Sequence, residues 1–194
     1  MVQGDSLFSD AGGKVLQLKH EILLQKCEFR RVNLLLSPIQ PDKISLIQQM
    51  ARRIWDVHYT PIIGQTQVDY MLGRFYTTEH ITGQLEEGQR FYFVLHNGIE
   101  VGYTAISEIR EGNFFIHKLY LEIDKQRKGM GSEVFRQLLA LLPNLEAVRL
   151  QVNRQNMKAI NFYFKMGFVI EQVADFDIGD GYFMNDFVMV YRPK

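Results

Sequence analysis

The sequence lacks several features that would assign a protein to a class at once. Only one of its 194 residues is a cysteine, Cys27, so no internal disulfide can form. We interpret Cys27 as structural and expect a reducing compartment. Lys and Arg total 22, as do Asp and Glu, so the formal net charge is zero. No overall field favours nucleic acid or anionic lipid, and we expect neither as a partner.

Long apolar runs are also missing. No stretch reaches the ~18 apolar residues of a membrane helix. Residues 1–14 contain no basic segment followed by an apolar run, the pattern of a secretory signal. We therefore expect a soluble, cytoplasmic protein. Residues 1–27 are rich in Gly, Ser and Asp near their start, which is typical of a mobile N-terminal arm rather than a packed element.

What is present is enough apolar sequence, 46% of the residues, for one packed domain, which we place at residues 28–194. Apolar spacing predicts a strand, two helices, three strands, a helix, a strand, a helix and two strands. The expected strands cover 29–37, 90–96, 100–107, 113–123 and 147–152, with two more around 179–181. The expected helices cover 44–55, 65–76, 134–142 and 156–166, and Asp42 or Ser45 is the expected cap of the first.

The most informative segment runs from Leu119 to Ser132. It reads as a strand, a basic turn with two glycines, and an amphipathic helix. The first N–H groups of a helix have no partner within it and lie at the positive end of its dipole, so such a turn suits an anion. Arg127 and Lys128 add positive charge there. The alternative is an ordinary strand-to-helix connection with a glycine cap.

Two common phosphate motifs do not fit this turn. A dinucleotide-binding fingerprint needs a third glycine where Val134 stands. A nucleotide-hydrolase loop needs Lys and then Ser or Thr after Gly131, where Ser132 and Glu133 stand instead. Neither a nicotinamide cofactor nor a hydrolysed nucleotide is expected.

Two blocks resemble the GCN5-related N-acetyltransferase (GNAT) family. Gln126-Arg127-Lys128-Gly129-Met130-Gly131 is similar to its Gln/Arg-x-x-Gly-x-Gly/Ala signature. The stretch from Asn156 through Ala159 and Tyr163 to Gly167-Phe168 is similar to its Asn-x-x-Ala-x-x-x-Tyr-x-x-x-Gly-Phe element. The resemblance implies an α/β fold of mixed α+β type, with a central, mostly antiparallel sheet of about six to seven strands flanked by helices.

The resemblance also implies an activity, the transfer of acetyl from acetyl-CoA to a primary amine by direct attack in a ternary complex, without a metal. The strand before the signature would pair with pantetheine and polarise the thioester carbonyl, and the turn would hold the pyrophosphate. Asn156 would contact the cofactor, cap its helix, or do both. The implied cofactor-binding residues are Leu119, Tyr120, Leu121, Gln126, Arg127, Lys128, Gly129, Met130, Gly131, Ser132 and Asn156.

The implied general acid is Tyr163, which would protonate the departing thiolate; a core tyrosine with a satisfied hydroxyl is the alternative. Some family members carry a Glu as base five residues before the Asn, but here that position is Gln151, which cannot act as a base. His117, whose alternation would place it on one strand face with Leu119 and Leu121, is the nearest titratable residue. An ordered water is the alternative base.

The acceptor would be bound by the first two helices and the last hairpin, in an aromatic pocket or at an acidic rim, unless these residues serve only the core and the turns. The acceptor is a small molecule, a peptide N-terminus or a protein lysine, and we expect a monomer or homodimer. The competing interpretation is a coenzyme A-binding regulatory module with little turnover. The candidate recognition residues are Trp55, Asp56, His58, Tyr59, Tyr70, Asp175, Asp177, Asp180 and Asp186.

Overall fold

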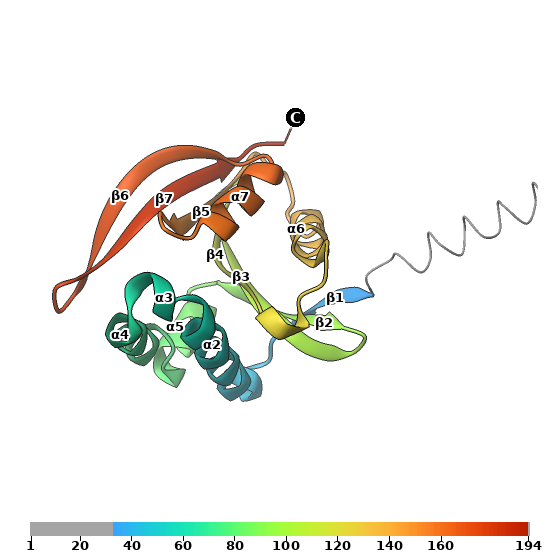
Figure 1. Cartoon of the computed structure of the whole chain (residues 1–194). Coiled ribbons are helices and arrows are strands. Elements are labelled where there is room, and N and C mark those ends of the chain that lie inside the picture. Colours follow the sequence, from blue (N-terminus) through green and yellow to red (C-terminus); the bar gives the residue numbers. More distant parts are fainter. Residues whose placement is uncertain (1–32, 194) are drawn as a thin grey trace, which may run out of the picture. The chain divides into compact units, whose positions relative to one another are not determined.

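The computed structural model describes residues 33–193, which form one seven-stranded sheet in the order β1-β2-β3-β4-β5-β7-β6 (Figure 1). All neighbouring strands are antiparallel except β4 and β5. The expected fold class is confirmed, whereas the N-terminal arm, Cys27 and residues 29–32 lie outside the described residues. The strands are β1 Leu34–Pro38, β2 Arg90–His96, β3 Ile99–Arg110, β4 Asn113–Leu121, β5 Ala147–Asn153, β6 Val169–Gly179 and β7 Tyr182–Tyr191.

Two helices were missed between the first two strands. The short α3 contains a proline in its first turn, and α5 buries only Ile81, so neither has the apolar stripe that reveals a helix. Thr77 caps α5 by accepting a hydrogen bond from the His80 N–H at 3.1 Å. The helices are α2 Ile44–His58, α3 Thr60–Ile63, α4 Gln65–Phe75, α5 Thr78–Glu86, α6 Met130–Ala140 and α7 Met157–Lys165, with 3-10 turns η1 Pro41–Lys43 and η2 Ile123–Lys125.

Two predicted boundaries were also wrong. Neither Asp42 nor Ser45 caps α2, because the chain enters that helix through η1 without a side-chain cap. Strand β4 ends at Leu121 rather than at residue 123, since η2 begins at Ile123. These errors are local and leave the order of the predicted elements intact.

The two faces of the sheet are covered by different sets of helices. Helices α2 to α5 gather on one face and α6 and α7 on the other (Figure 1). The first face is rich in aromatic side chains, including Trp55, Tyr76 and Tyr103, whereas the second is centred on residues such as Phe114, Phe135 and Phe168. None of the helices within residues 33–193 is long and apolar enough to cross a membrane.

Strand β4 changes its pairing in the middle. Its pairing with β5 extends only from Asn113 to Ile116. Immediately beyond that point the register with β3 shifts, because Ala105 faces Lys118 while Ile106 faces Ile116. His117 is thus the extra residue of a β-bulge, which bends the strand and interrupts the ladder. The two parallel strands separate from here on, and the β4 edge beyond the bulge is open to a ligand.

Candidate functional site

A first pocket of about 270 Å³ lies along the unpaired edge of β4, between the turn that begins α6 and the start of α7. It brings together both predicted catalytic residues and nearly all predicted cofactor-binding residues. Lys128 is the exception, since it is exposed and does not line this pocket. The predicted residues that line it are His117, Leu119, Tyr120, Leu121, Gln126, Arg127, Gly129, Met130, Gly131, Ser132, Asn156 and Tyr163.

The turn before α6 is shaped to receive an anion. Gly129 has a φ of 91°, a conformation that favours glycine, and starts the helix without a side-chain cap. Within residues 33–193, the N–H groups of Gly129, Gly131 and Ser132 have no backbone or side-chain acceptor. A Cβ on Gly131 would lie 3.1 Å from the ring of Phe162, so the glycine also lets α6 approach α7. Free amides at the positive end of a helix fit the pyrophosphate of coenzyme A.

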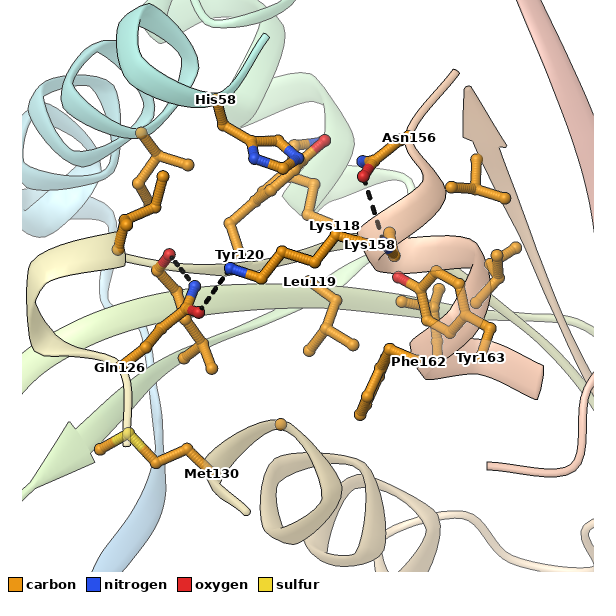
Figure 2. Close-up of a pocket in the computed structure, with 18 of the residues that line it drawn as sticks. His58, Lys118, Leu119, Tyr120, Gln126, Met130, Asn156, Lys158, Phe162 and Tyr163 are labelled. Atoms are coloured by element: carbon orange, nitrogen blue, oxygen red, sulfur yellow. Dashed lines mark hydrogen bonds between the residues drawn. The ribbon is translucent and has the colours of Figure 1, made fainter. Parts of the chain in front are cut away.

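A polar bridge crosses this pocket. The Lys158 ammonium donates to Oε1 of Gln126 at 3.1 Å, and Nε2 of Gln126 donates to the Leu121 carbonyl at 3.1 Å (Figure 2). Lys158 occupies one of the unspecified positions of the second sequence block, so nothing in that block singled it out. The bridge places an exposed ammonium above the cavity, where it would add to the positive field at the turn.

Tyr163 lies on α7 and reaches the first pocket with only 8% of its surface exposed. Its ring packs edge-on against Phe162 and Phe168. No hydrogen bond of its hydroxyl is found within the described residues, which disfavours the interpretation of a core tyrosine with a satisfied hydroxyl. Burial raises the pKa of Tyr163, and the nearby Tyr59 raises it further. The phenol therefore keeps its proton at neutral pH and is available as a donor.

Asn156 is the cap of α7, since its side chain accepts a hydrogen bond from the Ala159 N–H at 3.2 Å (Figure 2). It is 3% exposed and lines the first pocket as well. The capping role expected from the sequence is therefore confirmed. A contact of its amide with a cofactor is compatible with this position and stays a prediction.

A second pocket of about 250 Å³ continues from the first beneath α2 to α5. Its walls include the aromatic rings of Trp55, Tyr59, Phe75, Tyr76 and Phe115. Trp55 contacts three of the neighbouring tyrosines, with ring centroids 4.8 to 6.0 Å apart. The residues that line both pockets are Tyr59, Ile116, His117, Lys118, Tyr120 and Gln151.

Two buried charges of opposite sign line the second pocket. The Lys118 ammonium donates to Oε1 of Gln84 at 2.9 Å and lies over the rings of Tyr76 and Phe91. Burial lowers the pKa of Lys118 to about 8. Burial raises the pKa of Asp186 to about 6, although the charge of Arg154 opposes the rise. Sequence reasoning missed Lys118, because a lysine in a strand gives no sign of being buried.

His117 lines both pockets, but not in the way its position in the strand suggested. The bulge breaks the alternation, because Leu119 packs with the cluster under α6 and α7, whereas the ring of His117 lies tilted against that of Phe115 with centroids 4.9 Å apart. Nε2 of His117 shares a hydrogen bond of 2.8 Å with the Ser107 hydroxyl. Burial, with the charge of Lys118, lowers the pKa of His117 to about 4. The imidazole is neutral at neutral pH and a weak base.

The structure divides the predicted recognition residues into two groups. Trp55, Tyr59 and Asp186 line the second pocket, and His58 lines the first. The others line neither, and they have structural partners instead. Asp56 accepts a hydrogen bond from Arg52, and the Tyr70 hydroxyl donates one to the Ile178 carbonyl. Asp175 forms an ion pair with Arg154, and Asp177 accepts a hydrogen bond from the Gly179 N–H. Asp180 lies in the turn between β6 and β7.

Known proteins are similar to this chain in sequence. Residues 49–168 match the sequence profile of the acetyltransferase (GNAT) family. An uncharacterised N-acetyltransferase of Mycobacterium tuberculosis is 33% identical over 97 residues, which make up 49% of this chain and 62% of that protein. The chain thus matches less than two thirds of the length of that curated relative.

Solved structures share the fold at lower identity. The PaiA N-acetyltransferase from Thermoplasma acidophilum in complex with coenzyme A gives a TM-score of 0.69 at 19% identity, over 82% of this chain and 99% of that one. Ard1 from Thermoplasma volcanium gives 0.63 at 23% identity, over 83% and 98%. A dodecameric spermidine N-acetyltransferase from Vibrio cholerae gives 0.59 at 18% identity, over 82% and 94%.

Proposed function

Because the chain belongs to the acetyltransferase (GNAT) family, we propose that it transfers an acetyl group from acetyl-CoA to a primary amine. The observation that carries the proposal is the meeting of two pockets at one open strand edge. The first pocket offers free helix amides and the edge of β4 that β5 leaves unpaired. The second pocket opens onto the same edge through the residues that the two pockets share. Two reactants held on either side of this edge need no covalent enzyme intermediate.

In the first pocket, the β4 backbone from Leu119 to Leu121 would pair with pantetheine, and the turn from Gln126 to Ser132 would hold the pyrophosphate. A β4 amide would polarise the thioester carbonyl, as an oxyanion donor does. Asn156 would contact the cofactor from the end of α7. These assignments are supported by the amides at the start of α6, which have no acceptor within residues 33–193, and by the β4 edge beyond Ile116, which β5 leaves unpaired.

Tyr163 is the proposed general acid. Its buried phenol stays protonated, lines the first pocket and has no competing hydrogen-bond partner within residues 33–193. The departing thiolate would take the phenolic proton as the carbon–sulfur bond breaks. His117 and an ordered water are candidate general bases. Gln151 lines the same pockets but cannot ionise.

The first experiment is thermal unfolding with and without acetyl-CoA. At ~100 times its dissociation constant, the ligand should stabilise the protein by about 2.7 kcal/mol, which is a shift of several degrees for a chain of this size. Free-thiol release over polyamines, amino acids, aminoglycosides and lysine peptides then identifies the acceptor class. The absence of any shift would contradict the proposed site.

One observation favours a second candidate function, a coenzyme A-binding module with little turnover. Gln151 lines both pockets at the position where some family members carry a Glu as base. In that case acetyl-CoA would still shift the melting temperature, but no amine in the screen would release free thiol above the rate of the protein-free control.

A further inference from the structure

Asp186 is a buried carboxylate without a partner among the residues that the structure describes. It is 6% exposed, lies on β7 and lines the second pocket. Within residues 33–193 its side chain makes no hydrogen bond and no ion pair, and Arg154, the positive charge that acts on it, is already paired with Asp175. Because an isolated buried carboxylate is costly, its persistence at a cavity wall points to a cationic ligand.

The rest of the wall suits the body of an organic amine. The rings of Trp55, Tyr59 and Tyr76 line the cavity, and Nε1 of Trp55 is buried with no acceptor in the described part of the chain. Aromatic faces attract a cation and pack against apolar groups. The pocket is therefore able to hold both an ammonium and a hydrophobic or aromatic substituent.

Lys118 limits how many positive charges can enter. It lines the same pocket from β4, while Asp186 lines it from β7, with β5 between the two strands. Lys118 is 7% exposed, and its ammonium has one neutral partner, Gln84. A second ammonium on the acceptor would meet this buried cation in a medium that screens it poorly.

We propose that Asp186 binds the ammonium of the acceptor and takes its proton, and that the acceptor is a primary amine on an apolar or aromatic body without a second positive charge. This inference rests on the proposed acetyl transfer. It separates the chain from its polyamine-acetylating structural neighbours, because the pocket holds one unpaired carboxylate and one buried cation.

Asp186, Tyr163 and water account for every proton of the transfer step. The ammonium gives one proton to the Asp186 carboxylate and becomes a neutral amine. Its nitrogen forms a bond to the acetyl carbonyl carbon, the carbon–sulfur bond breaks, and Tyr163 protonates the sulfur. The second nitrogen proton returns through water to the Tyr163 oxygen, and Asp186 releases its own to solvent. His117, whose pKa is about 4, is a weaker base for this role than Asp186, whose pKa is about 6.

The test uses three probes that differ in charge, with calorimetric binding measured in the presence of coenzyme A. We expect 2-phenylethylamine to bind at least tenfold more tightly than 2-phenylethanol, its neutral counterpart, and more tightly than spermidine. Equal binding of the amine and the alcohol, or tighter binding of spermidine, would overturn the inference. These measurements need only the wild-type protein.

A variant assigns the effect to one residue. Asp186→Asn should weaken the binding of 2-phenylethylamine at least tenfold and leave the affinity for 2-phenylethanol unchanged. Asp180→Asn removes the same charge from the exposed tip of the same hairpin and should change neither. Because burial raises the pKa of Asp186, its charge costs stability at neutral pH, so the Asn variant should be at least as stable as wild type. Equal effects of the two variants would exclude the role of Asp186.

A pH profile gives an independent readout. The kcat/KM for 2-phenylethylamine should fall below a pH of about 6, as Asp186 becomes protonated, and this limb should be absent in Asp186→Asn. The other groups that face the carboxylate or its pocket are Arg154, Asp175, Tyr59, His117 and Lys118. If the acid limb persists in the variant, another group carries it. An acetyl-CoA shift without these amine effects would overturn only this inference, whereas loss of the shift would overturn the proposed function itself.

Discussion

The two pockets differ in what they are made of. The first is built largely from main chain: a strand edge, a glycine turn and the amides of a helix start. The second is built from side chains that come from α2, α3, α4, α5 and three strands. A backbone-built site tolerates most side-chain changes but not an added Cβ at its glycines. A site built from side chains changes its ligand preference when those side chains are substituted. The first pocket therefore suits a cosubstrate that all family members share, and the second suits an acceptor that differs from one member to another.

Their charges differ as well. Arg127 and Lys158 of the first pocket are exposed, whereas Asp186 of the second pocket and Lys118, which lines both, are almost completely buried. Exposed charges are screened by salt, while buried ones keep most of their strength. Affinity for the cosubstrate should therefore fall with ionic strength more steeply than affinity for the acceptor.

The largest effect should come from Tyr163→Phe, which tests whether the chemistry belongs to the first pocket. Without the phenolic proton, kcat should fall by about 10² to 10³, a range typical of a lost general acid. The acetyl-CoA thermal shift and the KM for the amine should be preserved. Tyr191→Phe, which alters a tyrosine packed against Phe135 and Phe168 outside both pockets, is the matched control. An unchanged kcat would mean that water protonates the thiolate.

A smaller effect, on stability, should come from Lys118→Met, which tests the buried charge of the second pocket. The folded-state pKa of Lys118 is lowered to about 8, so wild-type stability should rise between a pH of about 8 and ~10.4 as the ammonium is lost. The Met variant should lack this rise and be more stable at pH 7 by about 2 to 3 kcal/mol. Denaturant unfolding at several pH values measures both. If the free energies of unfolding of the wild type and of Lys118→Met changed with pH in parallel, the Lys118 ammonium would be solvated rather than buried.

The smallest effect should come from Gly129→Ala, which tests the backbone character of the first pocket. An alanine at a φ of 91° costs about 1 to 2 kcal/mol. Gly88→Ala is a close control, because Gly88 has the same φ and also faces open space. Both variants should be destabilised by a similar amount, but only Gly129→Ala should weaken the binding of acetyl-CoA, by roughly tenfold. Equal acetyl-CoA affinity in the two would place the pyrophosphate elsewhere.

The contrast between the pockets also explains what the sequence could predict. Most residues of the first pocket fall in two short stretches of sequence, so the resemblance carried by Gly129, Gly131, Asn156 and Tyr163 was enough to predict which residues gather there. The second joins residues far apart in the chain, and the burial of Lys118 is created only when α5 covers β4. The bulge at His117 was equally hidden, because an extra residue in a strand leaves the composition of that strand unchanged.

That bulge has a consequence for how the chain tolerates changes in length. One additional residue of backbone separates the half of β4 that is joined to β5 from the half that is not. Deleting His117 would bring Lys118 and the residues after it into continuous register with β3. The gap between β4 and β5 beyond Ile116 would then be expected to close. Most single-residue deletions in a strand harm a protein by exposing its core, whereas this one would harm it by completing the sheet.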